Sequence, residues 1–174
     1  MSEVSVDQSK EAPRKVLGRL MTGETVIDRL TSHLHPGVEA LLPEALPRIN
    51  SQQRDYIVAE VDLGRTVGRQ TCVETTGDDE VVYAQRPNRK GLTRFVKGRE
   101  SAPTSSLTVI LMRQKDAMEP TYITMSAFVG KPSEMEPWDA KATPASAEYW
   151  KTHALIWGAE PVVEGTETTE CPWA

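Results

Sequence analysis

The stretch YIVAEVD, residues 56–62, decides the fold class, because its small and apolar residues recur at every second position. Ile57 and Val61 share one side of this stretch, and Glu60 and Asp62 share the other. A period of two is typical of a β-strand with one buried face. The pattern therefore predicts a strand whose Ile57 and Val61 side chains face a core.

Further strand patterns follow toward the C-terminus, separated by turn signals at 77–79 and 87–91. They predict a curved antiparallel sheet of about five strands. The expected strands cover residues 71–76, 80–84, 92–96, 106–112 and 122–129. The apolar residues expected to be buried are Ile57, Val61, Val82, Val109, Leu111, Ile123 and Phe128.

Upstream of residue 50 the period changes to three and four, which is typical of a helix face. Apolar residues with this spacing predict one helix over 16–30 and short, proline-bounded helices over 38–49. Near the C-terminus, Thr143 as N-cap and Pro144 at the first helical position predict a last helix that carries Leu155. Helices, then antiparallel strands, then a helix make an α+β fold, with the N-terminal helices covering the sheet.

The 174 residues, 39% hydrophobic and 26% charged, fit one globular domain. We expect this domain to cover residues 14–158. Residues 1–13 are polar and end in a proline, so we expect a disordered lead-in. Residues 159–174 are acidic, and we expect a flexible tail.

Two features of the chain bear on its location. The longest apolar runs, such as 109–112, are far shorter than the ~20 residues of a membrane-spanning helix. Residues 1–7 lack the basic and apolar regions of a signal peptide, and Cys72 and Cys171 are too few for a disulfide framework. We therefore expect a cytoplasmic protein with no membrane partner.

Charge is unevenly distributed along the chain, whose formal net charge is -5. Residues 83–99 hold six basic residues and no acid, whereas residues 132–174 hold eight acids and two lysines. A concentrated basic segment in an acidic protein indicates a local anion site, and a solvated loop is the alternative. The basic residues are Arg86, Arg89, Lys90, Arg94, Lys97 and Arg99.

Within this segment, Phe95 and Lys97 fall on the same face of the expected strand. An aromatic ring beside a cation is the pairing that binds single-stranded nucleic acid. Hydroxyl groups follow at Thr104 and Ser105, and Ser126 lies within a later strand, two residues after a threonine on the same face. Together these residue types favour a site for a phosphodiester.

Motifs for metal and cofactor chemistry are absent from the sequence. There is no phosphate-binding glycine loop, HExxH or GxSxG motif. His33 and His35 would point to different faces of a helix, which argues against joint metal binding. We therefore expect neither a metal nor a cofactor.

The order of basic strand 91–97, apolar strand 106–111 and strand 122–130, after N-terminal helices, resembles the barnase, EndoU, colicin and RelE-like superfamily of metal-independent RNase toxins. The resemblance covers residues 25 to 130, and residues 131–174 have no counterpart in it. It implies that RNA is the partner, that the 2′-hydroxyl attacks the phosphodiester, and that a cognate inhibitor protein exists.

The resemblance also suggests roles for individual residues. The catalytic candidates are Arg94 and Lys97 for transition-state charge, Ser126 for phosphate positioning, and His153 for proton transfer. The alternative for His153 is a packed residue between two tryptophans. The substrate-binding candidates are Arg86, Arg89, Phe95, Thr104 and Ser105.

Two other function classes stay open. An ADP-ribosyltransferase uses an arginine, a hydroxyl-rich strand start and a later Glu-x-Glu, an order that Arg86, 104–106 and 134–136 repeat. A non-catalytic module that binds nucleic acid or protein through the basic strands is the other alternative. Such a module binds anions without turnover.

Overall fold

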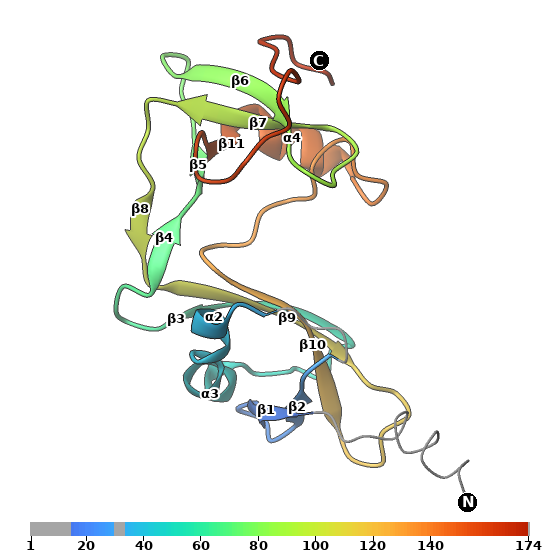
Figure 1. The fold of residues 1–174 in the computed structure, drawn as a ribbon. Coiled ribbons are helices and arrows are strands. Elements are labelled where there is room, and N and C mark those ends of the chain that lie inside the picture. The colour runs from blue at the N-terminus through green and yellow to red at the C-terminus, as the bar shows by residue number, and fades with distance from the viewer. Residues whose placement is uncertain (1–14, 30–33, 174) are drawn as a thin grey trace, which may run out of the picture. The chain divides into compact units, whose positions relative to one another are not determined.

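The computed structural model describes residues 15–29 and 34–173 and shows an α+β protein made mostly of strands (Figure 1). The chain forms two compact units: unit 1 comprises 1–65 and 106–129, and unit 2 comprises 66–105 and 130–174. Sequence patterns treat 14–158 as one domain, whereas each unit here has its own sheet. The lead-in expected over 1–13 lies outside the described residues.

Unit 1 contains a five-stranded sheet in the order β1-β2-β10-β9-β3. Neighbouring strands are antiparallel except β2 and β10, which are parallel. The strands are β1 (Val16–Arg19), β2 (Thr25–Ile27), β3 (Tyr56–Asp62), β9 (Ser106–Arg113) and β10 (Thr121–Val129). The strand patterns at 56–62, 106–112 and 122–129 thus predicted this sheet's larger part.

The helix predicted over 16–30 is wrong, because its described residues form β1 and β2. Its apolar residues come as adjacent pairs, Val16-Leu17 and Val26-Ile27, which fit a short strand as well as a helix. Pairing with β10, where Val26 lies opposite Tyr122, decides between the two. This contact spans almost a hundred residues, so local periodicity carries no sign of it.

Short helices in the N-terminal half are present as predicted. They are α2 (Pro36–Glu39), α3 (Leu42–Ala45) and the 3-10 turn η1 (Leu46–Arg48). Each element has a proline at its first or second position, as the fixed φ of proline allows. Leu42 and Leu46, the first residues of α3 and η1, are fully buried. His35 caps α2 by accepting a hydrogen bond from the backbone N–H of Gly37, at 3.1 Å, and His33 lies outside the described residues.

Unit 2 contains a four-stranded sheet in the order β5-β11-β7-β6 and a separate two-stranded ribbon of β4 and β8. The elements are β4 (Gly68–Gln70), β5 (Cys72–Glu74), β6 (Glu80–Gln85), β7 (Leu92–Lys97), β8 (Ala102–Thr104), α4 (Pro144–Thr152) and β11 (His153–Ile156). The single curved antiparallel sheet is therefore wrong. One cause is β11, a strand that the sequence patterns did not predict, which inserts between β5 and β7 and runs parallel to β7.

The C-terminal helix α4 begins as predicted, with Thr143 at the N-cap and Pro144 in the first turn. The backbone N–H of Thr143 donates to Ser146 Oγ at 3.0 Å, half of a capping box. The helix ends at Thr152, before the predicted Leu155, because the following residues pair with β5 and β7. His153 therefore begins a strand.

Five of the seven residues predicted to be buried are buried, and Ile123 and Phe128 are half-buried. On β10 the core positions belong instead to Tyr122 and Thr124, each 1% exposed. The register between β9 and β10 shifts between Thr124 and Ser126. A bulge of this kind breaks the alternation on which the expected shared face of these two residues depended.

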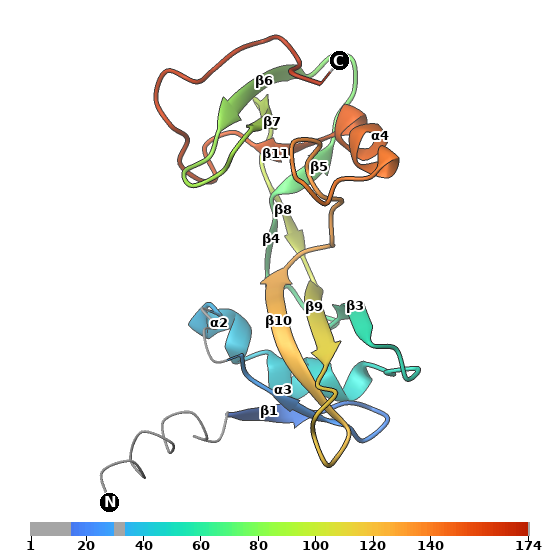
Figure 2. The same cartoon turned by 90° about the vertical axis from the view of Figure 1, so that its right-hand side faces the viewer.

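In unit 2 the helix α4 lies beside β11 (Figure 2). Apolar side chains cover both faces of the sheet. On one face Val82, Ala84 and Phe95 pack with Leu155, Trp157 and Val162, and on the other Val96, Ala154 and Ile156 pack with Val73. The basic strand β7 is thus the centre of a core rather than a free surface. Within residues 15–29 and 34–173, no helix has the length and apolarity to cross a membrane.

Candidate functional site

Arg86, at the end of β6, is held entirely within unit 2. Its Nε donates to Thr93 Oγ1 at 3.2 Å, Nη1 to Glu160 at 3.1 Å, and Nη2 to Glu136 at 2.5 Å. The Arg86 and Glu136 side chains are only 17% and 9% exposed. The arginine and glutamate of the ADP-ribosyltransferase comparison do meet, but as a buried ion pair that neutralises both.

Arg94, on β7, also uses its guanidinium inside the protein. Its Nη1 donates to Thr75 Oγ1 at 2.9 Å and to the backbone carbonyl of His153 at 3.0 Å. The His153 ring stacks on Tyr149, with centroids 3.9 Å apart, and its Nδ1 lies 2.9 Å from the Tyr149 carbonyl. The structure thus brings Arg94 and His153 together through a main-chain oxygen, with the imidazole engaged elsewhere.

Phe95 and Lys97 share a face of β7, as the strand period predicted. Phe95 is fully buried and meets Trp157 edge to face, with centroids 5.4 Å apart. The Lys97 ammonium lies 5.0 Å from the centre of the same indole. Trp157 therefore occupies the place that the sequence analysis assigned to a nucleobase.

The predicted hydroxyl groups are dispersed. Thr104 ends β8, where it pairs with Gly68, and Ser105 follows it in unit 2. Ser126 belongs to β10 in unit 1, on a different sheet from Arg94. Arg89 is exposed in the turn between β6 and β7.

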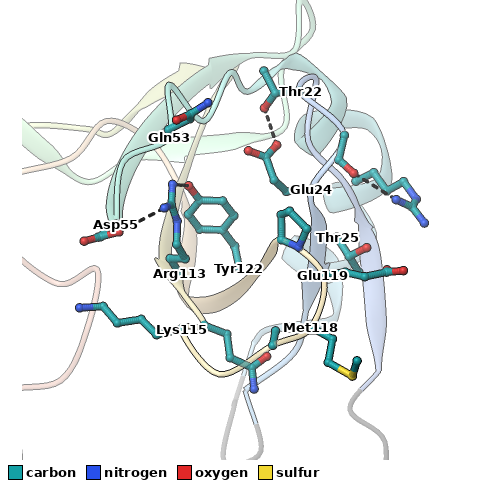
Figure 3. Close-up of a pocket in the computed structure, with 15 residues that line it drawn as sticks. Thr22, Glu24, Thr25, Gln53, Asp55, Arg113, Lys115, Met118, Glu119 and Tyr122 are labelled. Atoms are coloured by element: carbon teal, nitrogen blue, oxygen red, sulfur yellow. Dashed lines mark hydrogen bonds and ion pairs between the residues drawn. The ribbon is translucent and has the colours of Figure 1, made fainter.

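A polar pocket of about 1100 Å³ lies within unit 1 (Figure 3). Its walls come from the β1–β2 turn, the start of β3 and the β9–β10 hairpin, which bring Glu24, Asp55, Arg113, Lys115 and Tyr122 together. Ligand pockets commonly measure ~300–1,000 Å³, so a nucleotide fits this volume. None of these five residues was singled out from the sequence.

Glu24 is held on this pocket by two hydroxyl groups. Thr22 Oγ1 donates to Glu24 Oε1 at 2.5 Å, and Ser51 Oγ donates to Oε2. Partial burial opposes ionisation, but the hydrogen bonds from Ser51 and Thr22 outweigh it and lower the pKa of Glu24 below its usual 4.5. Glu24 is therefore ionised at neutral pH, with both oxygens in fixed positions.

Arg113 is oriented by Tyr122, its cross-strand partner in the β9–β10 hairpin. Its Nη2 donates to the Tyr122 hydroxyl at 3.2 Å, and its guanidinium lies 5.7 Å from the ring centre. The Tyr122 hydroxyl donates in turn to the Arg54 carbonyl, at 2.5 Å. Asp55 lies 3.6 Å from Nη1 and is largely exposed (Figure 3).

Glu24 and Arg113 interact electrostatically across the pocket, since each shifts the pKa of the other toward its charged form. Glu24 and Arg113 have separate hydrogen-bond partners, and they do not form a direct ion pair like that of Arg86 and Glu136. Lys115 and Arg19 add two cations to the lining. The arrangement can accept a proton at Glu24 and stabilise a phosphate charge at Arg113.

Part of this pocket has a signal in the sequence. Arg113 and Tyr122 flank the polar connection between two strands that the sequence does predict, so a hairpin places them opposite each other. Glu24 enters through the parallel pairing of β2 with β10, for which local patterns carry no signal.

Comparison of this chain with models of protein families, with curated proteins and with solved structures gives no match. Within the described part of the chain, no group of three or more histidine, cysteine, aspartate or glutamate residues is placed to hold a metal ion.

Proposed function

We propose that this protein is a metal-independent ribonuclease and that the unit 1 pocket is its reaction site. One observation carries the proposal: an ionised carboxylate, Glu24, and a guanidinium, Arg113, line one polar pocket without neutralising each other. RNA cleavage without metal needs a base for the 2′-hydroxyl and fixed positive charge for the phosphorane.

In the proposed reaction Glu24 takes the proton of the ribose 2′-hydroxyl, and the 2′-oxygen attacks the adjacent phosphorus. The bond from phosphorus to the 5′-oxygen breaks, which leaves a 2′,3′-cyclic phosphate and a 5′-hydroxyl. Arg113 stabilises the charge on the phosphoryl oxygens. Lys115 protonates the leaving oxygen, because the guanidinium groups of the described lining stay protonated in proteins.

The residues predicted from the sequence to be catalytic have no catalytic role in this proposal. Arg86 and Arg94 are held by Glu136 and by the His153 carbonyl, so neither supplies a free charge for the transition state. Ser126, His153 and Lys97 lie outside the pocket lining. The catalytic set therefore moves to Glu24, Arg113 and Lys115.

The test is cleavage of a defined RNA in EDTA by the full chain and its variants. Glu24→Gln and Arg113→Ala should each lower kcat by about 10²–10³, as removal of a base or of one charge-stabilising group does in other enzymes. Substrate affinity should change much less, because both groups act mainly in the transition state. The product should carry a cyclic phosphate.

Matched controls come from a second carboxylate–guanidinium pair in unit 1. Arg65 donates to Glu44 at 2.7 Å, and neither residue lines the pocket. Glu44→Gln and Arg65→Ala should therefore keep full activity. Loss of activity in the control variants alone, or a wild type that cleaves no RNA in EDTA, overturns the proposal.

The second candidate is the RNA-binding module without turnover. The observation in its favour is that Arg94 and Lys97 of β7 and His153 of β11 all have partners inside unit 2, so none of them is free to act in catalysis. It predicts that wild-type protein retains RNA without cleaving it. In that case Arg113→Ala weakens retention and Glu24→Gln does not.

A further inference from the structure

The C-terminal segment, defined here as residues 160–173, runs along the outer edge of β6 in unit 2. Tyr83 and Thr168 exchange two backbone hydrogen bonds of 2.8 Å, as in an antiparallel ladder. The backbone N–H of Val163 donates to the Gln85 carbonyl at 2.7 Å, and that of Gln85 donates to Thr166 Oγ1 at 3.0 Å. The segment predicted as a flexible tail thus covers an edge that would otherwise be open.

The segment also reaches both faces of the sheet. On one face Val162 packs against the Val82 cluster, and Glu160 is 3.1 Å from Arg86. On the other face Trp173 meets Tyr83 edge to face, with ring centroids 5.3 Å apart. Successive strand residues point to opposite faces, so the contacts at Val82 and Tyr83 enclose the strand from both sides.

Beneath the segment lies an aromatic–cation pair. Tyr83 stands opposite Arg94 in the β6–β7 ladder, and the two side chains interact electrostatically. Tyr83 is only 7% exposed. In proteins that bind single-stranded RNA, an aromatic ring stacks on a base and a neighbouring guanidinium contacts a phosphate. In this structure the Tyr83 ring is in contact with Trp173 instead.

The charges of the two partners are complementary. Residues 83–99 carry six basic residues and no acid, and the covering segment carries Glu160, Glu164, Glu167 and Glu170. The Glu160 side chain is 41% exposed, and ion pairs at such positions are weak and screened by salt. A polyanion that offers several phosphates can therefore compete with this segment.

We propose that the Tyr83–Arg94 face of the β6–β7 pair is a second surface for single-stranded RNA, and that residues 160–173 cover it until RNA displaces them. The surface lies in unit 2 and is distinct from the unit 1 pocket. The proposal rests on the proposed function only in taking RNA as the ligand.

The experiment measures binding of a fluorescent 2′-O-methyl oligonucleotide, which lacks the attacking hydroxyl and is not cleaved. In the full chain, the double variant Glu160→Gln/Thr168→Pro removes the ion pair and the N–H that donates to Tyr83. It should bind the probe about tenfold more tightly than wild type, and with a salt dependence steeper by about one phosphate contact. Adding Arg94→Gln to the double variant should abolish the gain.

Glu148→Gln is the matched control, because Glu148 is an exposed acid on α4, 2.9 Å from Lys151 and outside the segment. It should leave probe affinity unchanged. A gain as large as that of the double variant would show a mere charge effect and would overturn the proposal.

A measurement on the wild type covers the case in which the double variant does not fold. Hydrogen exchange at the Tyr83 and Gln85 amides, which the segment protects, should speed up when the probe binds. Unchanged or slower exchange overturns the proposal, and so does a double variant that self-associates through the freed β6 edge without a gain in RNA binding. Because the probe is not cleaved, these results are independent of whether the unit 1 pocket is catalytic.

Discussion

Unit 1 and unit 2 each hold an arginine and a glutamate in one neighbourhood, yet the two arrangements differ. Arg86 and Glu136 touch and are nearly buried, whereas Arg113 and Glu24 share a pocket and are held by other groups. A buried pair in contact has satisfied its charges and offers little to a ligand. The comparison shows that a separated pair with independent supports is the better candidate for chemistry.

The largest expected effect distinguishes these two arginines by stability. Arg86→Ala leaves Glu136 buried without its partner, and should lower the free energy of unfolding by about 3–5 kcal/mol. Arg113→Ala should cost only about 1 kcal/mol, because its ion-pair partner Asp55 is 64% exposed and the Tyr122 hydroxyl keeps its hydrogen bond to the Arg54 carbonyl. Urea unfolding measures both, and equal losses would contradict the distinction.

A second prediction concerns Phe95, which the sequence analysis placed in contact with RNA. Because it is fully buried against Trp157, Phe95→Ala should lower the free energy of unfolding by about 3–5 kcal/mol. Phe95→Leu should retain most of the stability. A stable Phe95→Ala variant that merely binds RNA less well would favour the original interpretation.

A third prediction uses the segment that brings Glu136 to Arg86. A Cβ added at Gly91 would lie 2.2 Å from Trp138 Cγ, so Gly91→Ala must displace the indole. We expect a loss of about 1–3 kcal/mol in thermal or urea unfolding. Gly77→Ala is the matched control, because nothing lies within 4 Å of its added Cβ. Similar losses in both variants would contradict the packing described here.

The smallest effect is the pH dependence of stability at Glu24. Its folded pKa lies below the usual 4.5, so the stabilisation is present above that value and is lost as pH falls through the folded pKa. Wild type should therefore exceed Glu24→Gln in stability near neutral pH, and the difference should shrink on acidification. Urea unfolding of both proteins across this range tests the sign, and a difference that grows on acidification would contradict it.

Periodicity in the sequence predicted the strands that are long enough to show an alternating pattern of apolar residues. Residues 56–62 alternate cleanly, and β3 forms over these residues. The helix α4 begins where its N-cap threonine and proline predict. In contrast, β2 and β11 are three and four residues long, and both exist through parallel pairing with distant strands. Short segments of this kind carry too few residues to show a period.

The same limit applies to the sites. The basic segment is visible in composition, but its neutralising partner Glu136 lies fifty residues from Arg86. The charge pattern of a sequence shows where basic residues cluster. It does not show which carboxylates contact them in the folded protein. Arg113 and Tyr122 were within reach of prediction, because a hairpin connects their strands. Glu24, which lines the pocket, and Ser51, which donates a hydrogen bond to it, come from loops that only the folded unit brings together.

The interleaved connectivity of the two units has a consequence for biosynthesis. Unit 1 is built from 1–65 and 106–129, with the first part of unit 2 between them. During translation, β2 cannot pair with β10 until β10 has been synthesised, and β7 cannot pair with β11 until β11 has been synthesised. Loop closure over such separations slows folding and leaves strand edges exposed in the nascent chain. Neither unit can therefore finish folding while the first hundred residues alone have emerged, and a chain that stalls near residue 105 leaves both sheets incomplete.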